Sequence, residues 1–178
     1  MILAISGLSG SGKTTIAKKL SEQINFPIIT TCTTRPMRPG EEHGKDYYFM
    51  TDEEFSNESI LAEEHFNVAG GHIWKYGIRE KDVCKNNCIV VLTPKGIADL
   101  KKSKHEILDI MVTVEDSIRK KRIFDRKDNQ SIDEIERRDR DDKAIFKNYK
   151  PMMEINNDNR DIDDTIKTLQ KMIIFYKK

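Results

Sequence analysis

The chain has 178 residues, of which 37% are hydrophobic and 34% carry a charge. This length provides one well-buried core and is too short for two ordinary domains, so we expect a single domain over residues 1–178. The 31 Lys and Arg residues almost balance the 30 Asp and Glu residues, which leaves a formal net charge of +1. Such a balance provides no overall attraction to nucleic acid or to an anionic membrane, so the composition favours a small-molecule partner over either of them.

Cysteine usage and hydropathy favour a cytoplasmic protein. Cys32, Cys84 and Cys88 form an odd set without Cys-x-x-Cys spacing, which indicates reduced thiols rather than a disulfide or a metal site. The longest unbroken apolar stretch, residues 88–92, is too short to cross a bilayer, and no basic leader precedes the first apolar run. We therefore expect a cytoplasmic protein without a membrane partner.

The first predicted element, a strand at residues 2–5, leads into a glycine-rich loop. Residues 7–14 have the P-loop sequence Gly-Leu-Ser-Gly-Ser-Gly-Lys-Thr, and a helical pattern follows. Glycines allow backbone N–H groups to surround nucleotide phosphates, Lys13 adds a positive charge, and the Thr14 hydroxyl is suited to bind Mg2+. The helix start adds the positive end of its dipole. The segment predicts an ATP site with Thr14 as the metal ligand, formed by Gly7, Ser9, Gly10, Ser11, Gly12, Lys13, Thr14 and Thr15.

Further apolar runs at residues 28–29, 89–92 and 107–114 alternate with helical patterns. Short runs of continuous hydrophobicity are typical of strands that are covered on both faces, so we expect an α/β fold with a parallel sheet. A last amphipathic helix is predicted from about residue 161. Helix-start signals occur at Thr93 followed by Pro94, at Thr51 with Glu54, and at Ser131 with Glu134.

Two segments do not match a simple crossover helix. The insertion at about residues 31–83 carries aromatic residues, glycines and charges, and it is much longer than an ordinary connection. The stretch at residues 119–143 mixes arginines with many acids and has little apolar surface, which is typical of a solvated helical hairpin. A long excursion from the sheet suggests that the insertion has a function.

The insertion resembles the nucleotide-binding insert of guanylate kinases. Residues 33–41 have the sequence Thr-Thr-Arg-Pro-Met-Arg-Pro-Gly-Glu, and Gly-Lys-Asp-Tyr follows at residues 44–47. Together with the P-loop, the Tyr76-Gly77 turn and the arginines downstream, the resemblance covers most of the chain. It implies a P-loop NTPase three-layer fold, a nucleoside-monophosphate-binding insert at about 31–83 and an arginine-bearing lid at about 118–143. The implied reaction is transfer of the γ-phosphoryl group of ATP to GMP or dGMP.

The resemblance assigns acceptor-binding roles to residues of the insert. Arg35 and Arg38 would present guanidinium groups to the acceptor phosphate through bidentate, charge-assisted hydrogen bonds. Tyr47 and Tyr76 would add hydroxyl donors, and Thr31 stands where the family has its first base-binding serine.

The family pattern also places arginines on either side of a short turn in the lid. Arg122, Arg126 and Arg138 lie nearest to these positions, with Arg137 as the alternative if the turn shifts by one residue. Phosphoryl transfer passes through a loose transition state, so the protein contributes positioning and positive charge, and no general base is expected. The predicted catalytic residues are Lys13, Arg122, Arg126 and Arg138.

The base-binding positions depart from the family pattern. An ungapped comparison puts Ala62 where the family has an acid, so the acid would be Glu63 or Glu64, and we assign Glu63. The position after Tyr76-Gly77 is Ile78, which has no hydroxyl. The strand that usually carries Asp-x-Asp has Val-Leu-Thr at residues 91–93. Mg2+ is therefore expected to depend chiefly on Thr14, the nucleotide phosphates and water.

These departures leave alternatives to a GMP kinase. The acceptor would otherwise be another nucleoside monophosphate, such as a pyrimidine or modified deoxynucleotide, because lost hydrogen-bonding groups change selectivity. A non-catalytic protein-binding module is the second alternative, although the intact P-loop argues against it. A GTPase would need an Asn-Lys-x-Asp segment, which the sequence lacks. Asn157 is assigned as an ATP contact by resemblance, with a plain polar turn as its alternative.

Overall fold

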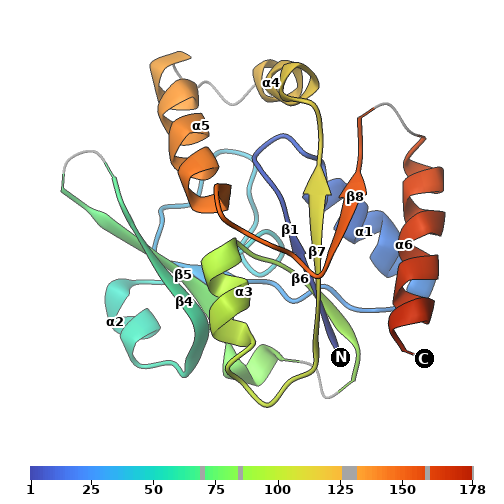
Figure 1. Ribbon diagram of the computed structural model, residues 1–178. Helices are drawn as coiled ribbons and strands as arrows, with labels where there is room; N and C mark the ends of the chain where they lie inside the picture. Colours follow the sequence, from blue (N-terminus) through green and yellow to red (C-terminus); the bar gives the residue numbers. More distant parts are fainter. Residues whose placement is uncertain (69–70, 84–85, 126–131, 159–160, 178) are drawn as a thin grey trace.

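The core of the molecule is a parallel sheet with the strand order β6-β1-β7-β8. The computed structural model describes residues 1–68, 71–83, 86–125, 132–158 and 161–177 (Figure 1). The sheet strands are β1 (Ile2–Ser6), β6 (Cys88–Val91), β7 (Ile107–Thr113) and β8 (Met153–Asn156). All five residues of β1 are buried, as expected for a strand that is covered on both faces.

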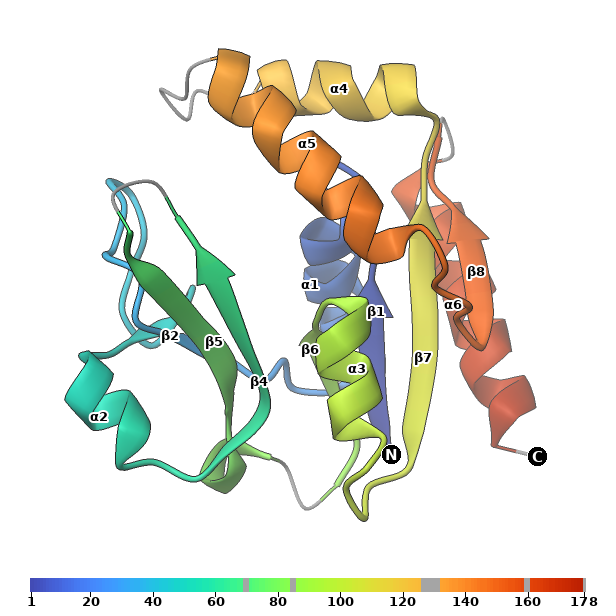
Figure 2. The same cartoon turned by 60° about the vertical axis from the view of Figure 1, so that its left-hand side comes forward.

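Side chains of β1 alternate between two hydrophobic cores. Leu3 and Ile5 contact α1 (Lys13–Ile24) and α6 (Ile162–Tyr176) on one face of the sheet. Ile2 and Ala4 face α3 (Pro94–Leu100) and the insert on the other face. The result is three layers, as Figure 2 shows, and it confirms the expected α/β fold with a parallel core sheet.

The insert forms a second sheet with the strand order β3-β2-β5-β4. Its elements are β2 (Cys32–Thr33), β3 (Tyr48–Phe49), α2 (Asp52–Ser56), β4 (Ile60–Asn67), β5 (Ile73–Arg79) and the 3-10 helix η1 (Glu80–Asp82). The antiparallel strands β4 and β5 form the long hairpin of this sheet. Ala62 and Ile78 of the hairpin belong to the core that also contains α3, which fixes the hairpin against the first sheet.

A β-bulge interrupts β4. Leu61 pairs with Ile78 and the next pair is Glu64 with Tyr76, so β4 advances by one more residue than β5. Ala62 has a left-handed backbone conformation (φ 52°), which accommodates the extra residue. Because strand side chains alternate between two faces, this extra residue places Glu64 rather than Glu63 on the face of Tyr76.

Most local predictions are confirmed. The predicted strands at 2–5, 89–92 and 107–114 match β1, β6 and β7 to within a residue at each end. Residues 28–29 are an exception, because Ile28 makes only an isolated bridge to Ile89 and starts no strand. Thr93 caps α3, Thr51 and Glu54 form a capping box, and α6 begins directly after Asp161.

Some sequence predictions concern residues that the structure leaves undescribed. Ser131, of the second predicted capping box, and Cys84 lie outside the described residues, whereas Cys32 and Cys88 are buried thiols. Among the helices that the structure describes, none is long and apolar enough to cross a bilayer.

The charged segment after β7 forms two helices, α4 (Asp116–Phe124) and α5 (Ile132–Phe146). They lie beyond the carboxyl ends of the parallel strands (Figure 2). The interpretation of this segment as a solvated hairpin is wrong for Arg119, whose side chain is fully buried. Its guanidinium forms ion pairs with Asp116 on its own helix and with Asp139 on α5, so it joins the two helices.

Lys143 adds a second cation to this cluster, at 2.8 Å from Asp116 and 3.1 Å from Asp139. Hydrogen bonds from Lys143 and Arg119 lower the pKa of Asp116 to about 2. A carboxyl group with a lowered pKa stabilises the fold above its ordinary pKa, and that contribution is lost as the pH falls toward 2. The two helices are thus joined by a cluster of opposite charges around Asp116 and Asp139.

Candidate active site

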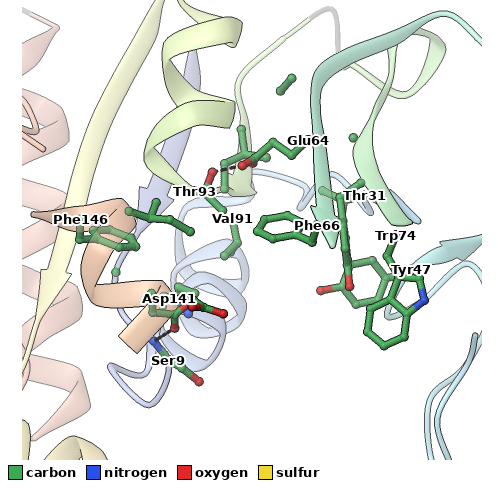
Figure 3. A pocket seen from close by; sticks show the side chains of 18 of the residues that line it. Ser9, Thr31, Tyr47, Glu64, Phe66, Trp74, Val91, Thr93, Asp141 and Phe146 are labelled. Carbon is green, nitrogen blue, oxygen red and sulfur yellow. Dashed lines mark hydrogen bonds between the residues drawn. The ribbon is translucent and has the colours of Figure 1, made fainter. Parts of the chain in front are cut away.

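A cavity of about 380 Å3 lies between the P-loop, the β4–β5 hairpin and α5. Figure 3 shows Ser9 and Asp141 at one end of the cavity and Tyr47 and Trp74 at the other, with Phe66 between them. Such a volume is in the range of small-molecule sites. Because the P-loop and the insert contribute opposite walls, a single space connects the two predicted anion sites.

The P-loop has the geometry of a phosphate-binding loop. Gly7 (φ 149°) and Gly12 (φ 91°) have positive backbone angles that favour glycine. A Cβ at Gly7 would lie 2.5 Å from the carbonyl oxygen of Val112, so the loop passes too close to β7 for any side chain. Gly12 precedes α1 directly, which leaves the first-turn N–H groups of α1 oriented toward the loop.

The predicted ATP residues occupy different parts of this loop. Gly7, Ser9 and Lys13 line the cavity, and Lys13 Nζ donates to the carbonyl oxygen of Leu8 at 3.4 Å. Thr14 and Thr15 are exposed in the first turn of α1, whereas Gly10 and Ser11 are buried. The Asn157 side chain lies against the loop and donates to the carbonyl oxygen of Ser11 at 2.8 Å. Asn157 therefore braces the P-loop, while its contact with ATP stays a prediction.

The insert brings four of its predicted residues to the cavity wall: Thr31, Arg38, Tyr47 and Tyr76. Tyr47 and Tyr76 pack edge to face with ring centroids 6.0 Å apart, so each tyrosine fixes the orientation of the other. Burial raises the pKa of Tyr47, which keeps its hydroxyl protonated and able to donate. Arg38 adds a guanidinium group to the same wall.

Arg35 differs from Arg38 because it is buried behind the wall. Its Nη2 donates to Glu41 Oε1 at 2.7 Å and its Nη1 donates to the carbonyl oxygen of Pro36 at 2.7 Å. Glu41 Oε2 also accepts from the backbone N–H of Arg38 at 2.8 Å. Burial opposes ionisation of Glu41, but the hydrogen bonds from Arg35 and Arg38 hold its pKa below the ordinary value. The ion pair of Arg35 with Glu41 therefore shapes the loop that presents Arg38.

The acid at the cavity is Glu64, which corrects the assignment to Glu63. Glu64 is 6% exposed and its Oε1 accepts a hydrogen bond from Thr93 Oγ1 at 2.5 Å. Burial raises its pKa above the ordinary value. Glu63 is on the opposite face of β4 and pairs with His65 at 2.7 Å. The physical reason is the bulge at Ala62, which exchanges the faces of the two carboxylates.

The lid helix α5 closes the third side of the cavity with Arg137, Asp141, Asp142, Ile145 and Phe146. Arg137, the alternative lid arginine, lies at the cavity and pairs with Asp141 at 2.7 Å.

Of the three assigned lid arginines, Arg122 is the one whose side chain the structure describes, and it does not line the cavity. Arg122 donates to the carbonyl oxygens of Asn157 at 3.1 Å and Asp158 at 2.9 Å, beside Gly12 of the P-loop. Arg126 lies outside the described residues. Arg138 is in α5, but its side chain is outside the described part of the structure.

Two contacts between the lid and the P-loop were missed by sequence reasoning. Asp142 of α5 accepts a hydrogen bond from the backbone N–H of Ser9 at 3.1 Å. Arg119 of α4 donates to the carbonyl oxygen of Ser9 at 3.2 Å. The contacts join residues more than 100 positions apart, and only the i, i+3 spacing of Asp116 and Arg119 was visible as a local signal.

Comparisons with known proteins agree with this geometry. The family model described as guanylate kinase matches residues 1–176. Guanylate kinase of Sus scrofa is 33% identical over 116 residues, which cover 62% of this chain and 59% of that protein. Guanylate kinase of Anaplasma phagocytophilum is 44% identical over 106 residues, which cover 56% of this chain and 45% of the relative. The match thus spans about half the length of these curated relatives.

Solved structures give the same result at the level of the fold. The crystal structure of guanylate kinase from Anaplasma phagocytophilum superimposes with a TM-score of 0.67 at 25% identity, covering 99% of this chain and 85% of the other. Shikimate kinase from Aquifex aeolicus has a TM-score of 0.52 at 14% identity, covering 99% of this chain and 98% of that one, and it supports the fold alone.

Proposed function

Because the chain belongs to the guanylate kinase family, we propose that it transfers the γ-phosphoryl group of ATP to GMP or dGMP, which yields ADP and GDP or dGDP. One observation carries the proposal above all. Lys13 of the P-loop and Arg38, Tyr47 and Tyr76 of the insert line the same cavity. An anion site for the ATP phosphates thus lies opposite an anion site for a single phosphate, as in-line transfer between two nucleotides requires.

The proposed donor site is the P-loop with the first turn of α1. Backbone N–H groups and Lys13 would hold the β- and γ-phosphates, and Asn157 would keep the loop in shape through Ser11. Mg2+ suits this site, because the Thr14 hydroxyl is exposed in the first turn of α1 beside the proposed phosphates. The ion would neutralise phosphate charge.

At the acceptor site, Arg38, Tyr47 and Tyr76 would orient the monophosphate. An oxygen of that phosphate attacks the γ-phosphorus while the bond between the γ-phosphorus and the β-bridging oxygen breaks, and ADP leaves. The protein supplies positive charge rather than a base. We propose Lys13 together with arginines of the lid for this role: Arg122, Arg126 and Arg138, with Arg137 already at the cavity.

The domain organisation follows from the same proposal. We propose one kinase domain over residues 1–178, in which the insert at about 31–83 binds the acceptor and the lid at about 118–143 covers the donor. Small-molecule nucleotides would be its partners. The second candidate, a kinase for another nucleoside monophosphate, is favoured by no observation of the described site and is kept as an outcome of the assay.

The test of the proposal is acceptor-dependent ADP release from ATP over a panel of ribo and deoxy monophosphates. We expect turnover with GMP and dGMP. Turnover with a pyrimidine monophosphate alone would select the second candidate. ATP and GMP binding without ADP release would support a non-catalytic module and would contradict the kinase proposal.

Replacement of Arg38 by methionine is expected to raise KM for the acceptor by about 10- to 100-fold, because a hydrogen bond to a charged group contributes about 1.5–3 kcal/mol. The Kd of ATP should stay unchanged, since Arg38 lies on the insert wall of the cavity. Steady-state kinetics and calorimetry measure the two quantities. Arg140→Met, on the exposed side of α5, is the matched control. An equal loss of ATP and acceptor binding would contradict an acceptor-specific role.

Asp142 is expected to oppose ATP binding, because its carboxylate accepts from the Ser9 N–H at the donor end of the cavity. Asp142→Ala should therefore tighten ATP binding by about threefold to tenfold, the value of one net hydrogen bond. Calorimetry at fixed ionic strength measures this change. Glu136→Ala, exposed on the same helix, removes an equal charge without the P-loop contact. Weaker ATP binding by Asp142→Ala would show instead that the contact supports the loop.

A further inference from the structure

A partly exposed aromatic ring, Phe66, lies in the middle of the cavity. Phe66 and Glu64 are two residues apart on β4, so both side chains are on the same face. Their cross-strand partners, Trp74 and Tyr76 of β5, share this face. All four residues line the cavity, and Figure 3 shows the Phe66 ring between Val91 and the side chain of Tyr47.

The orientation of the Phe66 ring is fixed by the acceptor wall. Its centroid is 5.4 Å from that of Tyr76, with an interplanar angle of 89°, which is an edge-to-face contact. Phe66 belongs to neither of the two hydrophobic cores that the described residues form. An aromatic face is thus presented to the cavity beside a tyrosine of the proposed phosphate site.

Besides Asn67, the residue after Phe66, few uncharged polar side chains are available for the edge of the acceptor base. The carboxyl group of Glu64 and the Thr93 hydroxyl form one hydrogen-bonded pair, and Thr31 adds a hydroxyl on the insert side. Ile78 is fully buried in the core with α3, so it contributes nothing to the edge. When edge contacts are few, contact with the face of the base carries a larger share of the binding energy.

We propose that Phe66 stacks on the base of the acceptor nucleotide and is a specificity-determining residue of this site. The proposal rests on the proposed function and deepens it. The side chain of Glu64, about 7 Å farther along the strand, would contact the edge of the same base. Stacking depends on ring area rather than on edge groups, so a purine should bind better than a pyrimidine, and loss of a single exocyclic group should matter less.

The decisive variant is Phe66→Leu, which keeps an apolar side chain and removes the ring. Stacking on an aromatic side chain is worth about 5- to 100-fold in affinity per base, so the Kd of GMP should rise within that range. Ribose 5-phosphate has the acceptor phosphate and no base, and its inhibition constant against GMP should change by less than about twofold. The Kd of ATP should also stay unchanged. Phe66→Tyr, which restores a ring, should recover GMP binding.

Trp74 is the only tryptophan of the chain and lines the cavity, so its fluorescence reports GMP binding directly. Phe175→Leu, 75% exposed on α6, is the control for replacement of a phenylalanine. The proposal is overturned if Phe66→Leu binds GMP as wild type does, or if ribose 5-phosphate binding weakens equally. Failure of the proposed function has a different signature, because the wild-type protein would then release no ADP with any monophosphate.

Discussion

Replacement of Lys13 by methionine is expected to lower kcat for acceptor-dependent phosphoryl transfer by at least about 100-fold, the effect of removing one preorganised electrostatic donor. Lys13 is the first residue of α1, and its side chain lies in the wall of the cavity that also holds Arg38 and Tyr76. Its charge would stabilise the negative charge that develops on the transferred group. Methionine keeps the length and packing of the side chain, so the variant isolates the charge.

The control for this variant is Lys18→Met, exposed on the same helix, which should retain wild-type kcat. Coupled ADP release at saturating ATP and acceptor measures both variants. Thermal unfolding of Lys13→Met should match that of the wild type, which separates catalysis from stability. A kcat within about tenfold of the wild-type value would contradict the role assigned to Lys13.

Replacement of Arg119 by leucine is expected to destabilise the protein by up to about 3–5 kcal/mol, because the buried guanidinium is removed and Asp139 keeps Lys143 as its remaining counter-charge. Arg119 is fully buried, and the carboxylate of Asp139 is only 13% exposed. The double variant Arg119→Leu/Asp139→Leu should recover most of this loss, since an apolar pair of similar volume often equals a buried ion pair. Chemical denaturation measures the free energy of unfolding.

The matched control is Lys102→Met, which removes an exposed i, i+3 partner of Asp99 and should cost less than about 1 kcal/mol. If Lys102→Met and Arg119→Leu lowered the free energy of unfolding by similar amounts, burial of the Arg119–Asp139 pair would be unimportant for stability. A double variant no more stable than Arg119→Leu would contradict the pairing of Arg119 with Asp139. Because Arg119 also donates to Ser9, the leucine variant should weaken ATP binding as well.

The proposed phosphate-binding parts of the site were predictable because their signals are local in sequence. The P-loop is defined by glycines at fixed spacing between a strand and a helix, and the structure places Gly7, Ser9 and Lys13 at the cavity as that pattern implies. Tyr47 and Tyr76 are 29 positions apart, and only the family resemblance assigned both to the acceptor site; the contact between their rings was not predicted.

The proposed base-binding end of the cavity was harder to predict because it depends on strand register. Glu63 and Glu64 are equivalent in composition and neighbours in sequence, and a single extra residue at Ala62 decides which of them faces the cavity. The same register places Phe66, two residues after Glu64, on the cavity face of β4. No sequence pattern marks a bulge of this kind, since Ala62 is a non-glycine residue in a left-handed conformation.

The lid was the least predictable part, because its important contacts are long-range and electrostatic. A helix rich in arginines and acids is ordinarily solvated, so the burial of Arg119 and its contact with the P-loop could be found only from the packing of α4 and α5. The contact of Asp142 with the P-loop was equally hard to predict, because a carboxylate is not expected beside a loop that is proposed to bind phosphate.

The central claim is that both nucleotides bind at once, across one cavity. Calorimetry with a guanosine–adenosine pentaphosphate, in which a phosphate chain joins the two nucleosides, tests this most directly. We expect one molecule to bind per chain, at least about 100-fold more tightly than ATP or GMP alone, because the second binding event becomes intramolecular. Binding no tighter than that of ATP, with the GMP site still accessible, would contradict the account.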